Sequence, residues 1–354
     1  MNEVVRFALS DKAATASLGI NITNEDFYSK VEAGAIGLSL LGSTEASGCC
    51  TDYSGNIYIA DSEAHAIFKI SEGGKISLLA GEPGTSGSMG TKQNVPALEA
   101  RFNTPMGIAC DRSNNIYVAD SGNNQIKVIN SGRVSVVAGS GASGLVDTSP
   151  TLTNGPLDAQ FNAPLDLDVD AKGVVYVADT GNHAVRKIEG GRVFTIAGNG
   201  DEGDLENVQS LGKNDSYFDS PNGICVDNDG NLFVSDTGNS KIKKITPRGW
   251  VYLHSGSGEQ GSSLGELKPG SNKINKDGES NPYTCEYAGL KMSDMDRSGN
   301  MYVIDKNEDS DALILVDKDG VPNIICRFDD SDGKNTAKAV CVSPGQKLFV
   351  VFSG

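Results

Sequence analysis

A short phrase that repeats at a nearly constant spacing constrains this chain more than any other feature. Its clearest copy is YVADTGNHAVRKI, which covers Tyr176 to Ile188. Two alternating segments flank its Asp-Thr-Gly-Asn turn, where Asp and Asn hydrogen-bond nearby backbone and Gly accepts a positive φ, so the phrase predicts a β-hairpin. The turn aspartates of successive copies lie 59, 59, 57 and 69 residues apart, at Asp61, Asp120, Asp179, Asp236 and Asp305. Such a period predicts a repeat architecture.

Each full repeat predicts four strands, which we letter a to d in chain order. In the third repeat they cover residues 165–169, 174–178, 184–188 and 193–197. The a–b and c–d connections are tight and contain mostly turn-forming residues. Four antiparallel strands repeated radially predict a β-propeller, in which each repeat forms one blade.

The two ends of the chain complement each other. Residues 339–352 supply only strands a and b, whereas residues 4–9 match strand c and residues 35–41 match strand d. We therefore predict an all-β, six-bladed propeller in one domain that covers residues 1–354. Its sixth blade combines 1–41 with 337–354, apart from an insertion at 11–34, so that the ring has no unpaired inner edge.

The repeats also carry family-specific phrases. Blades two to four contain RFNTPMGIACD, QFNAPLDLDVD and YFDSPNGICVD, each followed by a strand that ends in Asp-(Ser/Thr)-Gly-Asn. This pattern resembles the NHL-repeat propellers, and the resemblance implies their fold. The family includes RNA binders, lyases, sensors and scaffold proteins, so the resemblance does not by itself fix a function.

Charge and hydropathy restrict the partners. The net charge is −16, which opposes binding to nucleic acid and to anionic membranes. The sequence has no apolar run of membrane-spanning length, and charged residues interrupt its first twenty residues, so it predicts neither a membrane span nor a signal peptide. We expect no nucleic-acid or membrane partner.

The cysteines predict a reducing environment. Cys50, Cys225 and Cys341 occupy the same apolar position in three repeats, where a small buried thiol is expected and a disulfide is not. Free thiols without a signal peptide predict a cytoplasmic protein, or a particle assembled in the cytoplasm.

Two familiar motifs carry no chemistry in this context. The pattern G-x-G-x-x-G occurs at 139–144, 198–203 and 256–261, each time before a polar loop instead of a helix, so it indicates a loop consensus and not a nucleotide site. His65 and His183 are repeat-equivalent and His254 falls in a strand d, an arrangement that does not predict a zinc site or a catalytic histidine.

Carboxylates stand out on the innermost strands. At one aligned position, Asp168 and Asp294 replace the small uncharged residues of the other four blades, and Asp166 replaces a glycine. A lone buried carboxylate is costly, so these side chains either face water and backbone N–H groups or bind a metal. The second interpretation resembles the calcium-dependent lactonase propellers, with Asp168, Asp294 and Asn222 as candidate calcium ligands.

Four d–a connections are long, at 82–101, 140–160, 199–217 and 256–286. Because long loops are usually functional, we expect them to form a crescent on one face that binds protein partners. The candidate contact residues are Met89, Leu145, Val146, Asp201, Glu202, Asp204 and Glu206. The opposite face has a ring of cations in its c–d turns, at Lys75, Arg133, Arg192 and Arg248.

Two functions are compatible with these patterns. The first is a non-enzymatic interaction or structural propeller in a larger assembly, such as a virion or tail component, with no cofactor. The alternative is a calcium-dependent, lactonase-like hydrolase with its metal at the central channel. The sequence leaves enzymatic activity open.

Overall fold

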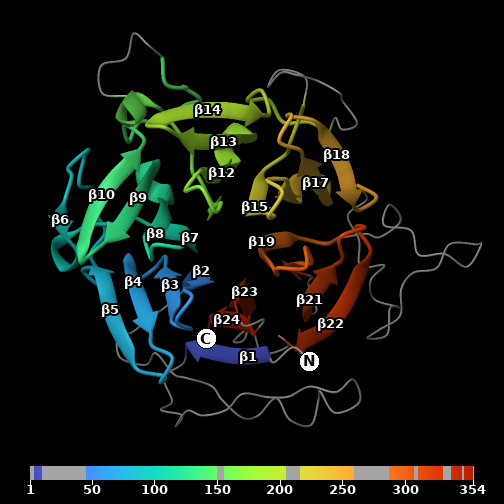
Figure 1. Cartoon of the computed structure of the whole chain (residues 1–354), viewed down its shortest axis with the longest axis horizontal. Coiled ribbons are helices and arrows are strands. Elements are labelled where there is room, and N and C mark those ends of the chain that lie inside the picture. The colour runs from blue at the N-terminus through green and yellow to red at the C-terminus, as the bar shows by residue number, and fades with distance from the viewer. Residues whose placement is uncertain are drawn as a thin grey trace, which may run out of the picture.

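The computed structural model describes residues 4–9, 45–149, 155–204, 216–258, 287–306, 310–329, 336–344 and 347–353. Within these residues the chain forms β-sheets arranged around a central axis (Figure 1). Five of the sheets are blades whose four strands are consecutive and antiparallel, with strand a nearest the axis. The described chain is therefore an all-β propeller, as predicted. None of its helices is long and apolar enough to cross a membrane.

The first three blades follow one another directly along the chain. The first comprises β2 (Ala46–Thr51), β3 (Ile57–Asp61), β4 (Ala66–Ile70) and β5 (Ile76–Gly81). The second comprises β7 (Pro105–Cys110), β8 (Ile116–Asp120), β9 (Gln125–Asn130) and β10 (Arg133–Ala138), with a short outer strand β6 (Val95–Pro96). The third comprises β11 (Asp166–Val169), β12 (Val175–Asp179), β13 (Ala184–Glu189) and β14 (Arg192–Ala197).

The last two blades have the same order. The fourth comprises β15 (Pro221–Val226), β16 (Leu232–Asp236), β17 (Lys241–Ile245) and β18 (Val251–Ser255). The fifth comprises β19 (Leu290–Met295), β20 (Met301–Asp305), β21 (Ser310–Val316) and β22 (Pro322–Asp329). Short 3-10 turns lie between the blades or between strands b and c, namely η1 (Ala97–Glu99), η2 (Ser121–Asn123), η3 (Gly155–Asp158), η4 (Thr180–Asn182) and η5 (Thr237–Asn239).

The turn chemistry of the sequence explains the tight a–b turns. In the first blade, Asp52 Oδ1 accepts hydrogen bonds from the backbone N–H groups of Ser54 and Asn56, both at 2.9 Å. The residue before Asn56 is Gly55, whose φ of 80° is costly for other residues. Equivalent bonds fix the turns that begin at Asp111, Asp170, Asp227 and Asp296.

The hydrophobic core lies between neighbouring sheets. Six clusters of buried residues each join two adjacent sheets, and one of them packs Ala46 and Ile59 of the first blade against Cys341 and Val351 of the last sheet. The innermost strands contact one another in the circuit β2, β7, β11, β15, β19, β23 and back to β2. The predicted thiols are confirmed as free and buried at Cys50, Cys225 and Cys341.

The sixth sheet differs from the predicted blade in one respect. It contains β23 (Thr336–Val342), β24 (Leu348–Ser353) and β1 (Val4–Leu9), in the order expected for strands a, b and c. However, β1 pairs with β24 in parallel, whereas strands b and c of the other blades are antiparallel. A short hairpin dictates the direction of strand c in those blades, and no turn joins β1 to β24. The predicted strand d at 35–41 and the insertion at 11–34 lie outside the described residues.

Two of the long connections pair with an outer strand in the parts that the structure describes. Strand β6, from the connection 82–101, pairs with the outer strand β10, and Thr148 of the connection 140–160 exchanges hydrogen bonds with Val193 of β14. Both segments thus run along the outer edge of the next blade. The edge of a strand d has unpaired backbone groups, and pairing with the loop satisfies them.

Candidate functional site at the centre of the ring

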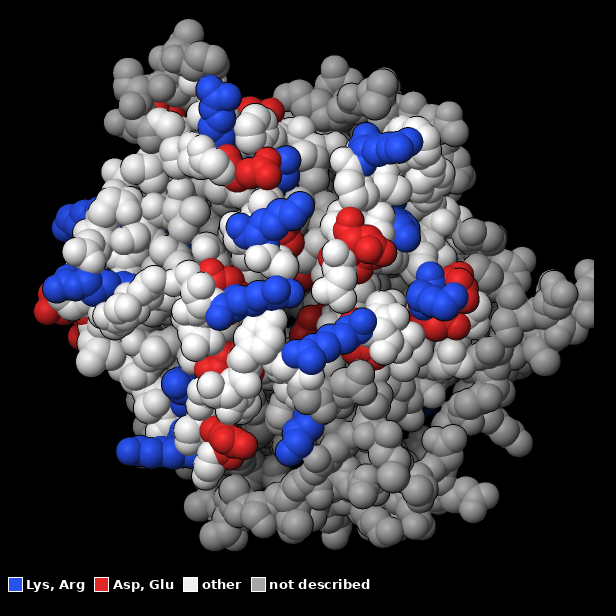
Figure 2. Space-filling view, in the orientation of Figure 1, with Lys and Arg blue, Asp and Glu red and all other residues white. Residues whose placement is uncertain are grey.

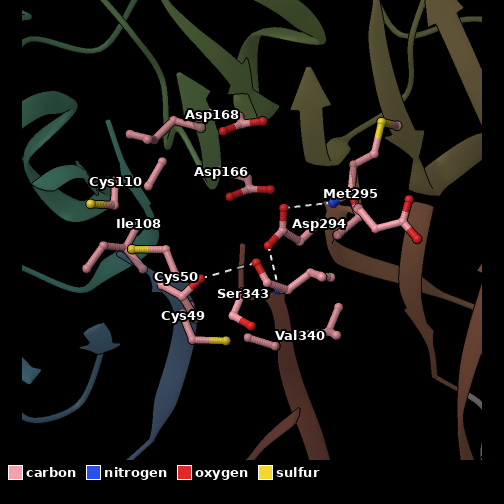
Figure 3. Close-up of a pocket in the computed structure, with 18 of the residues that line it drawn as sticks. Cys49, Cys50, Ile108, Cys110, Asp166, Asp168, Asp294, Met295, Val340 and Ser343 are labelled. Atoms are coloured by element: carbon pink, nitrogen blue, oxygen red, sulfur yellow. Dashed lines mark hydrogen bonds between the residues drawn. The ribbon is translucent and has the colours of Figure 1, made fainter. Parts of the chain in front are cut away.

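A hollow of about 190 Å³ lies at the centre of the ring. The innermost strands line it, and the three carboxylates Asp166, Asp168 and Asp294 lie around it (Figure 3). Its lining includes Tyr53, Arg297 and Pro344, which belong to a–b turns. The hollow therefore opens on the face that carries the tight turns.

Asp168 links the third blade to the fourth. Its Oδ1 accepts the N–H of Val169 at 2.7 Å, and its Oδ2 accepts the N–H of Val226 on strand β15 at 2.8 Å. Asp166 repeats this link deeper in the channel, since its Oδ2 accepts the N–H of Ile224 at 3.0 Å. Both carboxylates satisfy backbone donors at the exposed edge of the neighbouring inner strand.

Asp294 forms the same link between the fifth blade and the sixth sheet. Its two oxygens accept the N–H groups of Met295 and Val342, both at 2.7 Å (Figure 3). Hydroxyl groups provide the links at other junctions. Thr51 Oγ1 donates to the carbonyl oxygen of Val342 at 3.2 Å, and Ser47 Oγ donates to that of Pro105 at 2.7 Å. Side chains thus connect innermost strands that cannot form a continuous ladder.

The channel carboxyls are more basic than usual. Burial raises the pKa of Asp168 to about 7, and the charge of Asp294 adds to the effect. Burial also raises the pKa of Asp294 to about 6, although its two backbone hydrogen bonds act in the opposite direction. The pKa values of both carboxyl groups therefore lie closer to neutral pH than that of an exposed aspartate.

The predicted calcium ligands are only partly brought together. Asp168 and Asp294 line the same hollow, but Asn222 is not among its lining residues. Within the described chain, no group of three or more His, Cys, Asp and Glu side chains is placed to hold a metal ion. Each oxygen of Asp168 and Asp294 already accepts a backbone N–H. A calcium site requires six or more oxygens, so these two carboxylates would need further oxygen ligands to hold the ion.

The histidines also link blades. His65 and His183 follow the b–c turns with φ near 50°, and their Nδ1 atoms accept the N–H groups of Thr104 and Ser220 in the next blade. Asn124 occupies the equivalent position and accepts the N–H of Ala163 through Oδ1. His65 and His183 thus join neighbouring blades through hydrogen bonds to the backbone.

Sequence reasoning missed a repeated buried ion pair. In the third blade, Arg186 is fully buried, donates to Asp179 Oδ2 at 2.6 Å, and lies over the ring of Phe161 at 4.9 Å. The second and fourth blades repeat the arrangement with Asp120, Lys127 and Phe102, and with Asp236, Lys243 and Phe218. The available signal was a cation seven residues after the turn aspartate, inside an otherwise apolar strand.

These buried cations also hold the long connections. Arg186 donates to the carbonyl oxygen of Val146 at 2.9 Å and to Asp147 Oδ1 at 3.1 Å. In the fourth blade, Asp204 accepts from Lys241 at 2.6 Å and lies 3.1 Å from the ammonium of Lys243. Asp204, a predicted partner contact, therefore anchors its own loop.

The other predicted partner contacts have different environments. Met89 is buried under its own loop, and Val146 is exposed. Asp201 and Glu202 are exposed at the start of the third long connection, and Leu145 is half-buried. Glu206 lies outside the described residues.

Comparison with protein-family models gives two matches. The model of the teneurin NHL domain matches residues 55–189, and the NHL-repeat model matches residues 218–245. The chain carries NHL repeats. An NHL repeat-containing protein 2 from Homo sapiens is 30% identical over 172 residues, and the Arabidopsis thaliana chloroplastic protein SUPPRESSOR OF QUENCHING 1 is 29% identical over 293 residues. These matches cover 45% and 73% of this chain but only 23% and 25% of the two relatives.

Two solved structures with a similar fold are described by different functions. A gluconolactonase from Xanthomonas campestris superposes with a TM-score of 0.54 at 14% identity, over 88% of this chain and 84% of that one. An auxiliary nutrient-binding protein from Bacteroides ovatus superposes with a TM-score of 0.50 at 11% identity, over 83% of this chain and 61% of that one. At such identities the likeness establishes the fold alone.

Proposed function

We propose that this NHL-repeat chain is a non-enzymatic interaction propeller that forms part of a larger assembly. The proposal rests on the hydrogen bonds that the channel carboxylates accept. Asp166, Asp168 and Asp294 accept backbone N–H groups from the next innermost strand, so they serve the construction of the ring. The side chains best suited to catalysis are thus occupied in holding blades together.

We also propose that the ring has six blades in one domain. The sixth sheet packs against the first blade through a shared hydrophobic cluster, and Lys338 pairs with Glu45 across the same junction. In this arrangement β1 covers the outer edge of β24. Because strand pairing satisfies an otherwise exposed edge, β1 protects the ring from edge-to-edge association.

Protein contacts on the long connections remain our prediction. Leu98 and Val146 belong to two of these connections, and they are 61% and 37% exposed. The hydrogen bonds of Arg186 hold the second connection in place, so this loop is ordered before a partner binds. Membership of a virion or tail particle and a cytoplasmic location also stay predictions.

A calcium titration separates this proposal from the calcium-dependent hydrolase. Melting temperature is measured with calcium and with a chelator, for the wild type and for Asp168→Asn. We expect no shift with calcium. If calcium bound the folded state alone, it would have to raise the melting temperature. We expect Asp168→Asn to melt at a lower temperature, because it disturbs the link to Val226. A calcium-dependent rise that disappears in Asp168→Asn, together with hydrolysis of an aldonolactone, would favour the hydrolase instead.

A further inference from the structure

The mouth of the central hollow has a composition that the predicted functions do not use. The tips of the a–b turns surround it, and two further hollows of about 450 and 200 Å³ lie there. Tyr53, Arg112, Asn228 and Arg297 line the larger one, and Lys172 lines the smaller. Figure 2 looks onto the centre of the ring and shows Lys and Arg side chains spaced around it.

The cations at this mouth are available for a ligand. Arg112, Lys172 and Arg297 are exposed, and the structure pairs none of them with an acidic side chain of the described residues. The acids at the start of the turns line the same hollows, but their carboxylates are held by their own turns. Asp111 and Asp296, the neighbours of the two arginines, each accept two backbone N–H groups of their own turn. Among the described a–b turns, Asp229 is the one exposed acid.

The residue types at the mouth match those that dominate protein interfaces. Arg and Tyr are enriched among the residues that contribute most to binding, and Tyr53 is 55% exposed. A guanidinium binds a carboxylate with two parallel hydrogen bonds, and two arginines from different blades can hold two carboxylates of one extended segment. A protein segment with several acidic side chains fits this arrangement better than a single small anion, because the cations come from three separate blades.

We infer that the mouth of the central hollow on the tight-turn face binds an acidic segment of a protein partner through Arg112, Arg297 and Lys172, with Tyr53 as an apolar contact. This inference rests on the proposed function as an interaction propeller. It places a contact surface on the tight-turn face, opposite the face where the long connections join the strands. The chain itself has a net charge of −16, so the exposed side chains of Arg112, Lys172 and Arg297 mark where an acidic segment can approach.

The test uses the full chain and a fluorescein-labelled octaglutamate peptide, with binding measured by fluorescence anisotropy. The wild type should bind this peptide and not a peptide of the same length with Gln in place of Glu. The double variant Arg112→Gln/Arg297→Gln should bind at least tenfold more weakly. The matched double variant Lys75→Gln/Arg192→Gln removes two exposed cations from c–d turns of the same face and should keep the affinity within twofold. All four positions are exposed, so melting temperatures should stay equal and exclude unfolding as a cause.

Three results would overturn the inference. They are absence of binding by the wild type, equal weakening in both double variants, and complete displacement of the peptide by inorganic phosphate at an equal concentration of anionic groups. Equal weakening would show a diffuse electrostatic field, and displacement by phosphate would show a small-anion site. None of these outcomes touches the proposed function, which fails only if the calcium titration and the lactone assay give positive results.

Discussion

The buried cation of the third blade allows a sharp test of what stabilises the ring. Arg186→Met removes a fully buried guanidinium that pairs with Asp179 at 2.6 Å and with Asp147 at 3.1 Å. The methionine fills part of the space but leaves Asp179 fully buried without its counter-ion. Breaking a buried pair in this way typically costs about 3–5 kcal/mol, so we expect a loss of that order in the free energy of unfolding.

The neighbouring residue supplies the control. Lys187 pairs with Glu189 at 2.8 Å, but both side chains are partly exposed. Pairs of this kind contribute roughly 0–1 kcal/mol, so Lys187→Met should change stability little. Arg186→Lys should lie between the two, because lysine serves at the same position in the second and fourth blades but cannot donate to as many acceptors.

The pH dependence adds a signature that simple loss of packing would not give. Burial raises the pKa of Asp179, and the Arg186 charge opposes this effect. In Arg186→Met the folded-state pKa should rise further above the unfolded value. The folded state then retains a proton that the unfolded state has lost, so the stability of the variant falls as pH rises through this window. Urea unfolding at pH 5 and pH 8 measures both effects. A loss below about 1 kcal/mol, or one independent of pH, would refute the reasoning.

Three further predictions follow from the inner strands and the closure. Burial raises the pKa of Asp168 to about 7, so its contribution to stability should decrease as pH rises from about 4 to 7; thermal melts across this range should show a smaller decrease in Asp168→Asn. Gly107→Ala should destabilise the ring, because the added Cβ would lie 2.6 Å from Asp166 Cα, and unchanged urea unfolding would contradict the close approach of these strands. Deleting residues 2–10 should expose the edge of β24 and favour aggregation, and a monomer by light scattering with unchanged melting temperature would contradict the proposed role of β1.

Much of the architecture was predictable because its causes are local. The turn aspartate, the glycine with positive φ and the alternation of apolar residues act within one hairpin, so the five blades and their strand order appear as expected. The aligned position of Asp168 and Asp294 also holds, since both residues lie opposite a tyrosine of strand b at the same register. Because the motif repeats about every 58 residues, the same local reasoning applies to each blade.

The candidate site was predictable only in part. The pattern of small and acidic residues on the innermost strands identified the carboxylates of the hollow, but it could not choose between a metal and a backbone N–H as their partner. Asn222, for example, does not line the hollow. Which side chains of an innermost strand face the hollow depends on how that strand is oriented in the ring, and the sequence does not give this orientation. The basic mouth was missed because Arg112 and Arg297 resemble ordinary turn residues when each is considered alone.

The sequence by itself determined the repeat, the strand pattern, the burial of the thiols and the aligned inner position, because each depends on side chains a few residues apart. Only the tertiary structure decided that Asp168 accepts the N–H of Val226, that β1 runs parallel to β24, and that the connection 82–101 follows an outer strand. Each of these features depends on which backbone donors and acceptors a neighbouring sheet leaves unpaired. Such groups become known only when the blades are placed around their common axis.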